Sequence, residues 1–182
     1  MPDSGKLYFE QLSEDNKPSD FQCSDKDLDE FLLDDALMHQ DEKIAMTTLV
    51  FYEDRVVAYF SLCTDCISLK AEEKEELCEY EIKYTEFPAI KIARLAVISD
   101  FQNRGIGKTI LKYIVGYARS LQDDIGVRFL SVDAYPKSAE FYEHLGFLYN
   151  LHAKERGNKH THSMRYDLEP LIYEGDGSTE GN

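Results

Sequence analysis

Hydrophobic and polar positions along this chain follow two periods, one typical of strands and one typical of helices. Apolar residues recurring every three to four positions predict helices at 105–121 and 138–145, and a third that begins at Ser24, where Asp27 completes a capping-box-like pair. Short apolar runs predict strands at 7–12, 47–52, 55–66, 89–97, 127–134, 147–152 and 163–168. Strands and helices alternate without an internal repeat or a linker, so we expect one compact α/β unit.

Two polar segments interrupt this pattern. Residues 71–83 contain six Glu, and the simplest expectation is an exposed, solvated helix or loop. Residues 174–182 are small and polar, as in a disordered tail. The sequence therefore predicts a single domain over residues 1–173, followed by a tail at 174–182.

Composition restricts the class of protein further. The chain has 182 residues, of which 43% are hydrophobic, and its formal net charge is −15. The apolar content suffices for a core, and no apolar run reaches the roughly 18 residues that a membrane-spanning helix needs. The N-terminus lacks the features of a signal peptide. We expect a soluble cytoplasmic protein, and so acidic a surface disfavours nucleic-acid and membrane partners.

The charge is unevenly distributed along the chain. Residues 1–90 carry 23 acidic and 8 basic residues, whereas residues 91–120 carry one acidic and six basic residues. This basic window predicts an anion-binding site within an otherwise acidic protein. Its basic residues are Lys91, Arg94, Arg104, Lys108, Lys112 and Arg119.

Cysteine and histidine residues give no comparable signal. Cys63 and Cys66 form a CxxC pair, but positions three apart on a strand point to opposite faces. His160 and His162 could share a strand face, yet neither pair has the further ligands of a metal site. We expect no metal and no secreted disulfide framework.

The most informative stretch is a Gly-rich turn between a predicted buried strand and a predicted helix. A helix N-terminus presents unpaired N–H groups that bind phosphate oxygens. A Walker loop needs Gly five positions before Gly107, where Gln102 stands, and a dinucleotide fingerprint needs Gly at Ile110, so both motifs fail. The candidate anion-binding residues are Gln102, Asn103, Arg104, Gly105, Ile106, Gly107 and Lys108.

This turn resembles the acetyl-CoA signature Q/R-x-x-G-x-G/A of the GNAT superfamily of acetyltransferases. A second family segment, A/S-x-x-F-Y-x-x-x-G-F, matches residues 138–147. The resemblance implies a mixed, mostly antiparallel central sheet, splayed between the strands at 89–97 and 127–134 and flanked by helices on both faces. Acetyl-CoA would lie in that cleft as co-substrate. Its pyrophosphate would meet the amides of 102–108, and its pantetheine arm the backbone of Leu95, Ala96 and Val97.

The resemblance also implies direct attack of an amine on the thioester, with Tyr142 at the position whose hydroxyl faces the sulfur as general acid. The general base stays open, because Lys91 occupies the position where some members have Glu. Asp133, Asp65, Glu53 and an ordered water are the alternatives. Tyr135 replaces the Asn that many relatives place near the pantetheine arm.

The acceptor is left open among three hypotheses. The first is a primary amine of a small molecule, peptide or protein, favoured if acidic residues lie beside the cleft. The second follows from residues 21–36 and the 94–108 string, which look like the subgroup that includes toxin acetyltransferases of aminoacyl-tRNA. The net charge opposes it, unless a basic face surrounds the cleft. The third is a non-catalytic acyl-CoA-binding module. A homodimer is also left open.

Overall fold

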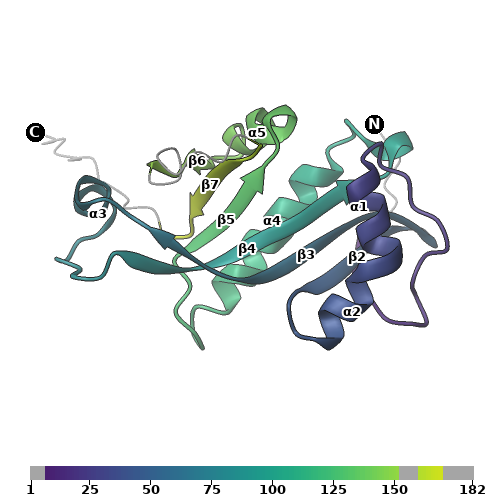
Figure 1. The fold of residues 1–182 in the computed structure, drawn as a ribbon, viewed down its shortest axis with the longest axis horizontal. Coiled ribbons are helices and arrows are strands. Elements are labelled where there is room, and N and C mark those ends of the chain that lie inside the picture. Colours follow the sequence, from purple (N-terminus) through teal and green to yellow (C-terminus); the bar gives the residue numbers. More distant parts are fainter. Residues whose placement is uncertain (1–6, 152–159, 170–182) are drawn as a thin grey trace, which may run out of the picture.

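A seven-stranded sheet forms the centre of the molecule, in the order β1-β2-β3-β4-β5-β7-β6 (Figure 1). A computed structural model describes residues 7–151 and 160–169. Neighbouring strands are antiparallel except β4 and β5, which are parallel. The strands are β1 (Leu7–Gln11), β2 (Met46–Tyr52), β3 (Arg55–Ser68), β4 (Glu86–Val97), β5 (Phe129–Ala134), β6 (Leu148–Tyr149) and β7 (His162–Asp167).

The sheet opens between its two parallel strands. β4 pairs with β5 only from Ala89 to Lys91, opposite Phe129 to Ser131. Beyond Lys91, β4 continues to Val97 with its other edge bonded to β3, so its edge toward β5 has no strand partner among the described residues. The result is the expected mixed, mostly antiparallel α/β sheet, splayed in the middle.

Helices cover the two faces of the sheet. The helices are α1 (Lys26–Glu30), η1 (Phe31–Asp35), α2 (Ala36–Asp41), α3 (Ala71–Leu77), η2 (Ser99–Phe101), α4 (Ile106–Ser120) and α5 (Pro136–Glu143). Tyr59 packs on Phe31 of η1, whereas the next residue, Phe60, contacts Tyr113 of α4. Successive strand residues point to opposite faces. α1, η1 and α2 therefore lie on one face and α4 on the other (Figure 1).

A β-bulge in β4 changes which residues share a face. Ser61 pairs with Arg94 and Cys63 pairs with Lys91, although 61 and 63 are two positions apart and 91 and 94 are three apart. The extra residue is Ala93, which has no partner on β3. Lys91 and Arg94 consequently project from the same face of the sheet. That face is the one that carries α1, because Tyr59 lies two positions from Ser61.

The first helix does not begin as the sequence predicted. Its N-cap is Asp25, and Ser24 takes a left-handed backbone conformation, with φ of 69°. The Ser24 hydroxyl bonds the hydroxyl of Ser99 at 2.8 Å instead of capping the helix. The capping-box expectation was therefore wrong, because a tertiary hydrogen bond takes the side chain that would have capped α1.

The acidic segment at 71–83 also differs from expectation. Residues 71–77 form α3, but Glu73 is buried and pairs with the buried Arg165 of β7 at 2.7 Å. A small separate core supports this end of the sheet, made of Ile67, Leu69, Phe87, Ala89 and Phe129. One side of α3 is therefore exposed to solvent, whereas Glu73 attaches the other side to β7.

Other boundaries shift by a few residues. β4 begins three residues before the predicted strand, and α5 spans Pro136–Glu143 where the sequence predicted 138–145. Part of the predicted strand at 147–152 and the predicted tail at 174–182 lie outside the described residues. Within the described part of the chain, no helix is long and apolar enough to cross a bilayer.

Candidate active site

The splay between β4 and β5 opens into a cleft of about 940 Å³. α1, the turn before α4 and the start of α5 contribute walls to it. Ten of the eleven residues singled out from the sequence line this cleft, and Arg104 is the one that does not. The ten are Leu95, Ala96, Val97, Gln102, Asn103, Gly105, Ile106, Gly107, Lys108 and Tyr142.

The turn that leads into α4, residues 98–105 (the α4 loop), is held by the side chain of Gln102. Its amide nitrogen donates to the carbonyl of Val97 at 2.9 Å and to that of Cys23 at 2.8 Å. Asn103 and Gly105 both have positive φ, at 59° and 83°. Two left-handed residues turn the chain sharply, and the first residues of α4, whose amides have no partner within the helix, line the cleft.

The two glycines of the motif have different structural reasons. Gly105 needs its positive φ, and a Cβ there would meet nothing within 4 Å. A Cβ on Gly107 would lie 3.0 Å from the Phe141 ring. Gly107 therefore lets α5 approach α4, a role that the local sequence did not reveal. Phe141 in turn contacts Tyr142 edge-on, with centroids 5.1 Å apart.

Arg104 lies beside the cleft and not in its wall. Its guanidinium stands 5.0 Å over the ring of Phe101. Lys108, in the first turn of α4, does line the cleft. The basic window predicted from the sequence thus supplies the cleft with Lys91, Arg94 and Lys108.

These features suit acetyl-CoA. The open edge of β4 from Ile92 to Val97 offers backbone groups that an extended chain with amide groups can pair with, as an added strand does. The N-terminus of α4 and Lys108 offer donors and charge for phosphate oxygens. The volume of the cleft accommodates a ligand of this size class.

Tyr142 on α5 is buried, at 6% exposure, and lines the cleft. Its hydroxyl makes no hydrogen bond to any other described residue. Burial raises the pKa of this phenol, so it stays protonated throughout the physiological range. A protonated phenol in the wall of a cleft is chemically able to donate a proton to a ligand bound there.

Two of the base candidates, Asp65 and Asp133, lie in a strip of polar residues on the face that carries α1. We call this set the polar strip; it consists of Asp65, Lys91, Arg94, Ser131 and Asp133. Lys91 Nζ donates to Asp133 Oδ2 at 2.6 Å, and Ser131 Oγ donates to Asp65 Oδ2 at 2.5 Å. Strand pairing aligns β3, β4 and β5 at these positions.

The protonation of Lys91 follows from its neighbours. Burial opposes its charge, but the hydrogen bond and negative charge of Asp133, helped by Asp65, raise the pKa of this ammonium above its ordinary value. Lys91 is therefore a fixed cation and not a base. Glu53 lies in the hairpin turn between β2 and β3 and does not line the cleft.

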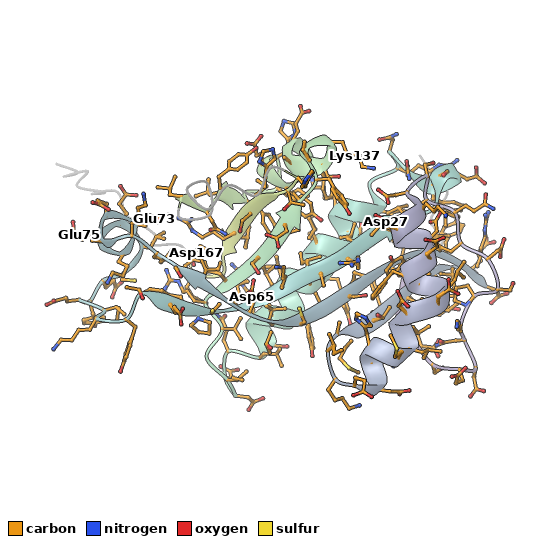
Figure 2. All side chains as sticks on the ribbon, viewed as in Figure 1. Asp27, Asp65, Glu73, Glu75, Lys137 and Asp167 are labelled. Atoms are coloured by element: carbon orange, nitrogen blue, oxygen red, sulfur yellow. The ribbon has the colours of Figure 1, made fainter. Side chains whose placement is uncertain are left out.

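An ion pair that the sequence did not suggest joins two walls of the cleft. Lys137 Nζ, at the start of α5, lies 2.8 Å from Asp25 Oδ2, at the start of α1. The two residues are 112 positions apart, so only the fold brings them together. Figure 2 shows Lys137 and Asp27 near this end of the sheet, with Glu73 and Asp167 near the α3 end.

Cysteines and histidines form no cluster of metal ligands within the described residues. Cys63 and Cys66 are both free thiols. They lie on opposite faces of β3, as their spacing predicted, because no bulge separates them.

Comparison with known proteins decides the family. The acetyltransferase (GNAT) family matches residues 8–147 of this chain. The chain belongs to the GNAT family of acetyltransferases. It is therefore an acetyl-CoA-dependent N-acetyltransferase, which transfers an acetyl group to an amine.

Solved structures of other GNAT proteins share its fold. A tyrosine-to-phenylalanine variant of KacT is 20% identical, with a TM-score of 0.72, covering 89% of this chain and 95% of that one. AtaT complexed with acetyl-methionyl-tRNAfMet is 23% identical, with a TM-score of 0.71 and coverage of 89% and 95%. AtaTR bound with acetyl-CoA is 24% identical, with a TM-score of 0.71 and coverage of 89% and 94%.

Proposed function

We propose that this GNAT enzyme acetylates an α-amino group, such as that of an aminoacyl ester or a peptide N-terminus, and not a lysine side chain or a polyamine. The observation behind this proposal is that the cleft has no free base among its described lining residues. Asp133 is paired with Lys91, and Asp25 is paired with Lys137. Lys91 itself is held protonated.

The pKa of the acceptor amine then decides which acceptors can react. A lysine or polyamine ammonium has a pKa near 10.4, whereas an α-amino group has one of roughly 7.7–8.0. A sizeable fraction of α-amino groups is neutral near pH 8 without help from the enzyme. A cleft without a strong base favours this class of acceptor, because only a neutral amine can attack the thioester.

The two ion pairs, Lys91 with Asp133 and Lys137 with Asp25, also remove the argument for a cationic acceptor. Acidic residues beside the cleft would have favoured a polyamine, but both acidic lining residues are neutralised by lysines. Arg94 and Lys108 remain as cations in the cleft wall. The acidity of the chain as a whole therefore does not extend into the cleft.

In this proposal the residues of the cleft have separate roles. Acetyl-CoA supplies the activated acetyl group when bound, with its phosphates at the N-terminus of α4. The backbone of Leu95, Ala96 and Val97 orients the pantetheine arm. Tyr142 donates a proton to the leaving sulfur, and its buried hydroxyl suits this role because it has no other partner among the described residues.

Among α-amino acceptors, aminoacyl-tRNA has the support of a structural neighbour. AtaT, whose fold this chain shares, has been captured with acetyl-methionyl-tRNAfMet. The net charge of −15 opposes broad contact with the tRNA body. We therefore propose that an aminoacyl-tRNA would be engaged through its aminoacylated 3′ end, where the cleft presents its cations.

Release of CoA in the presence of a panel of amines tests the proposal. The panel comprises aminoacyl-tRNA, a dipeptide amide, N-acetyl-lysine amide with a free ε-amine, and spermidine. We expect activity with the first two and near-background rates with the last two at pH 7.5. Faster acetylation of spermidine or of the ε-amine than of both α-amines would overturn it.

A second measurement separates an enzyme from a binding module. Acetyl-CoA binding is followed by calorimetry alongside turnover. Tight binding of acetyl-CoA with background turnover on every amine would favour a non-catalytic regulatory module. Raising the pH from 7 to 9 should accelerate acetylation of the α-amine and then level off, as its ammonium loses its proton.

A further inference from the structure

The polar strip contains one cation that no carboxylate of the described residues neutralises. Lys91 is paired with Asp133, and Lys137, at the rim of the cleft, is paired with Asp25. Lys108 lies at the start of α4, on the opposite face from α1. Arg94 is exposed, lines the cleft and makes no ion pair with any described carboxylate.

The guanidinium of Arg94 is nevertheless held in place. Its Cζ lies 4.9 Å from the centre of the Phe31 ring, and its Nη1 donates to the carbonyl of Ala93 at 2.8 Å. Phe31 is itself buried, between a stacked Tyr59 and an edge-on His39. A guanidinium stacked on a fixed ring loses little further entropy when its remaining N–H groups bind a ligand.

The bulge at Ala93 determines where this group points. Without the extra residue, Arg94 and Lys91 would project from opposite faces of β4. With it, Arg94 stands on the face of α1 and of the Lys91–Asp133 pair. The N-terminus of α4, with its phosphate-binding amides, belongs to a helix on the other face. Arg94 and the first turn of α4 line the same cleft, but Arg94 enters it from the face that carries α1.

We propose that Arg94 binds one oxyanion of the acceptor, a phosphodiester or a carboxylate located close to the amine that is acetylated. This inference rests on the proposed α-amino acceptor and names what else that acceptor must present. Arginine binds both oxyanions through paired N–H donors. Lys91 cannot serve in its place, because its ammonium already bonds Asp133 at 2.6 Å.

Two matched pairs of acceptors test this site. A dipeptide with a free carboxylate is compared with its amide, and aminoacyl-tRNA is compared with the aminoacyl-adenosine that lacks phosphate. Wild-type enzyme should prefer the anionic member of at least one pair by about 10- to 100-fold in kcat/KM. The pair that shows the preference identifies the source of the oxyanion.

Three variants then assign the preference to Arg94. Arg94→Met should abolish it while leaving acetyl-CoA affinity and the rate with the uncharged acceptor unchanged, and Arg94→Lys should retain part of it. Lys112→Met removes an exposed cation that does not line the cleft and should leave the preference intact. Thermal melting of each variant confirms that Phe31 keeps its packing.

Distinct outcomes overturn the inference and the proposed function. A preference that survives in Arg94→Met, or a loss of acetyl-CoA affinity in that variant, overturns the oxyanion site. Absence of acetylation with all four acceptors overturns the proposed function instead. In that case, binding of the four acceptors to the complex with desulfo-CoA still tests Arg94, and equal affinity within both pairs overturns the site.

Discussion

The α4 loop and the polar strip both contribute residues to the cleft but are built in different ways. The α4 loop is a contiguous stretch, closed by the amide of Gln102 on two backbone carbonyls and by two left-handed residues. The polar strip is assembled from three strands and depends on pairs of charges, such as Lys91 with Asp133.

This difference indicates which part of the site can change in sequence: the part that binds the cofactor or the part that meets the acceptor. A loop made of backbone amides recognises phosphate whatever its side chains are, so it suits a cofactor that is common to a whole family. A strip made of side chains on separate strands can change one residue at a time. We therefore expect acceptor preference to depend on the polar strip and cofactor affinity on the α4 loop.

Tyr142→Phe should have the largest effect on turnover. Loss of the proton donor should lower kcat by about 10²- to 10⁴-fold, the usual contribution of general acid catalysis, with the KM for acetyl-CoA unchanged. Steady-state kinetics measures both. Tyr117→Phe, which removes an exposed hydroxyl of α4, serves as the control and should be silent. An unchanged kcat in Tyr142→Phe would remove its role as acid.

Glu73→Ala should have the largest effect on stability. Removing one partner of the buried pair leaves Arg165 charged and buried, which costs about 3–5 kcal/mol of the free energy of unfolding. Denaturant titration measures this value. The exposed Glu75→Ala, on the same helix, should stay within about 0.5 kcal/mol of wild type. Equal losses in the two variants would show that α3 is not anchored by Glu73.

Gly105→Ala, at the end of the α4 loop, and Gly107→Ala, in the first turn of α4, should separate backbone strain from side-chain packing. The first forces a Cβ into a left-handed conformation and should cost about 1–2 kcal/mol of stability with kcat retained. The second pushes on Phe141, which contacts Tyr142, so it should lower kcat as well. Steady-state kinetics and thermal melting of both variants separate the two effects. An identical kcat in the two would contradict the contact with Phe141.

Lys137→Met should have the smallest effect. Its ion pair with Asp25 is 66% exposed on the lysine side, and exposed pairs contribute up to about 1 kcal/mol. We expect release of acetyl-CoA to accelerate by no more than about fivefold. Stopped-flow measurement at low and high salt tests this, since salt should mask the difference. A larger effect that persists in Asp25→Asn would assign the pair a role in closing the cleft.

Much of the α4 loop and of its surroundings could be predicted from the sequence. The strand, the turn and the helix start follow one another in the chain, so local periodicity and glycine placement were enough to locate residues 102–108. Tyr142 was singled out only through the resemblance to the GNAT segment that also contains Phe141 and Gly146. The structural role of Gly107 could not be predicted, because the Phe141 ring that leaves no room for a Cβ there belongs to another helix.

Little of the polar strip or of the Glu73–Arg165 pair could be predicted in the same way. Regular alternation places positions 91 and 94 on opposite faces of a strand, and only the pairing with β3 reveals the bulge that brings them together. Segment 71–83 has the composition of a solvated helix, and nothing nearby in the chain signals that Glu73 meets Arg165 across 92 positions. A charge on a helix is expected to face water unless a distant partner compensates for its desolvation.

The sequence by itself determined the order of strands and helices along the chain, the apolar faces that form the core, and the Gly-rich turn before α4, because each depends on residues within a few positions of one another. The tertiary structure decided which charges in the cleft are free. In the part of the chain that the structure describes, Arg94 has no carboxylate partner in the cleft, whereas Asp25 and Asp133 are paired with lysines from other elements. Ion pairs join residues that the register of strands and the packing of helices bring within 4 Å, and sequence distance does not specify that proximity.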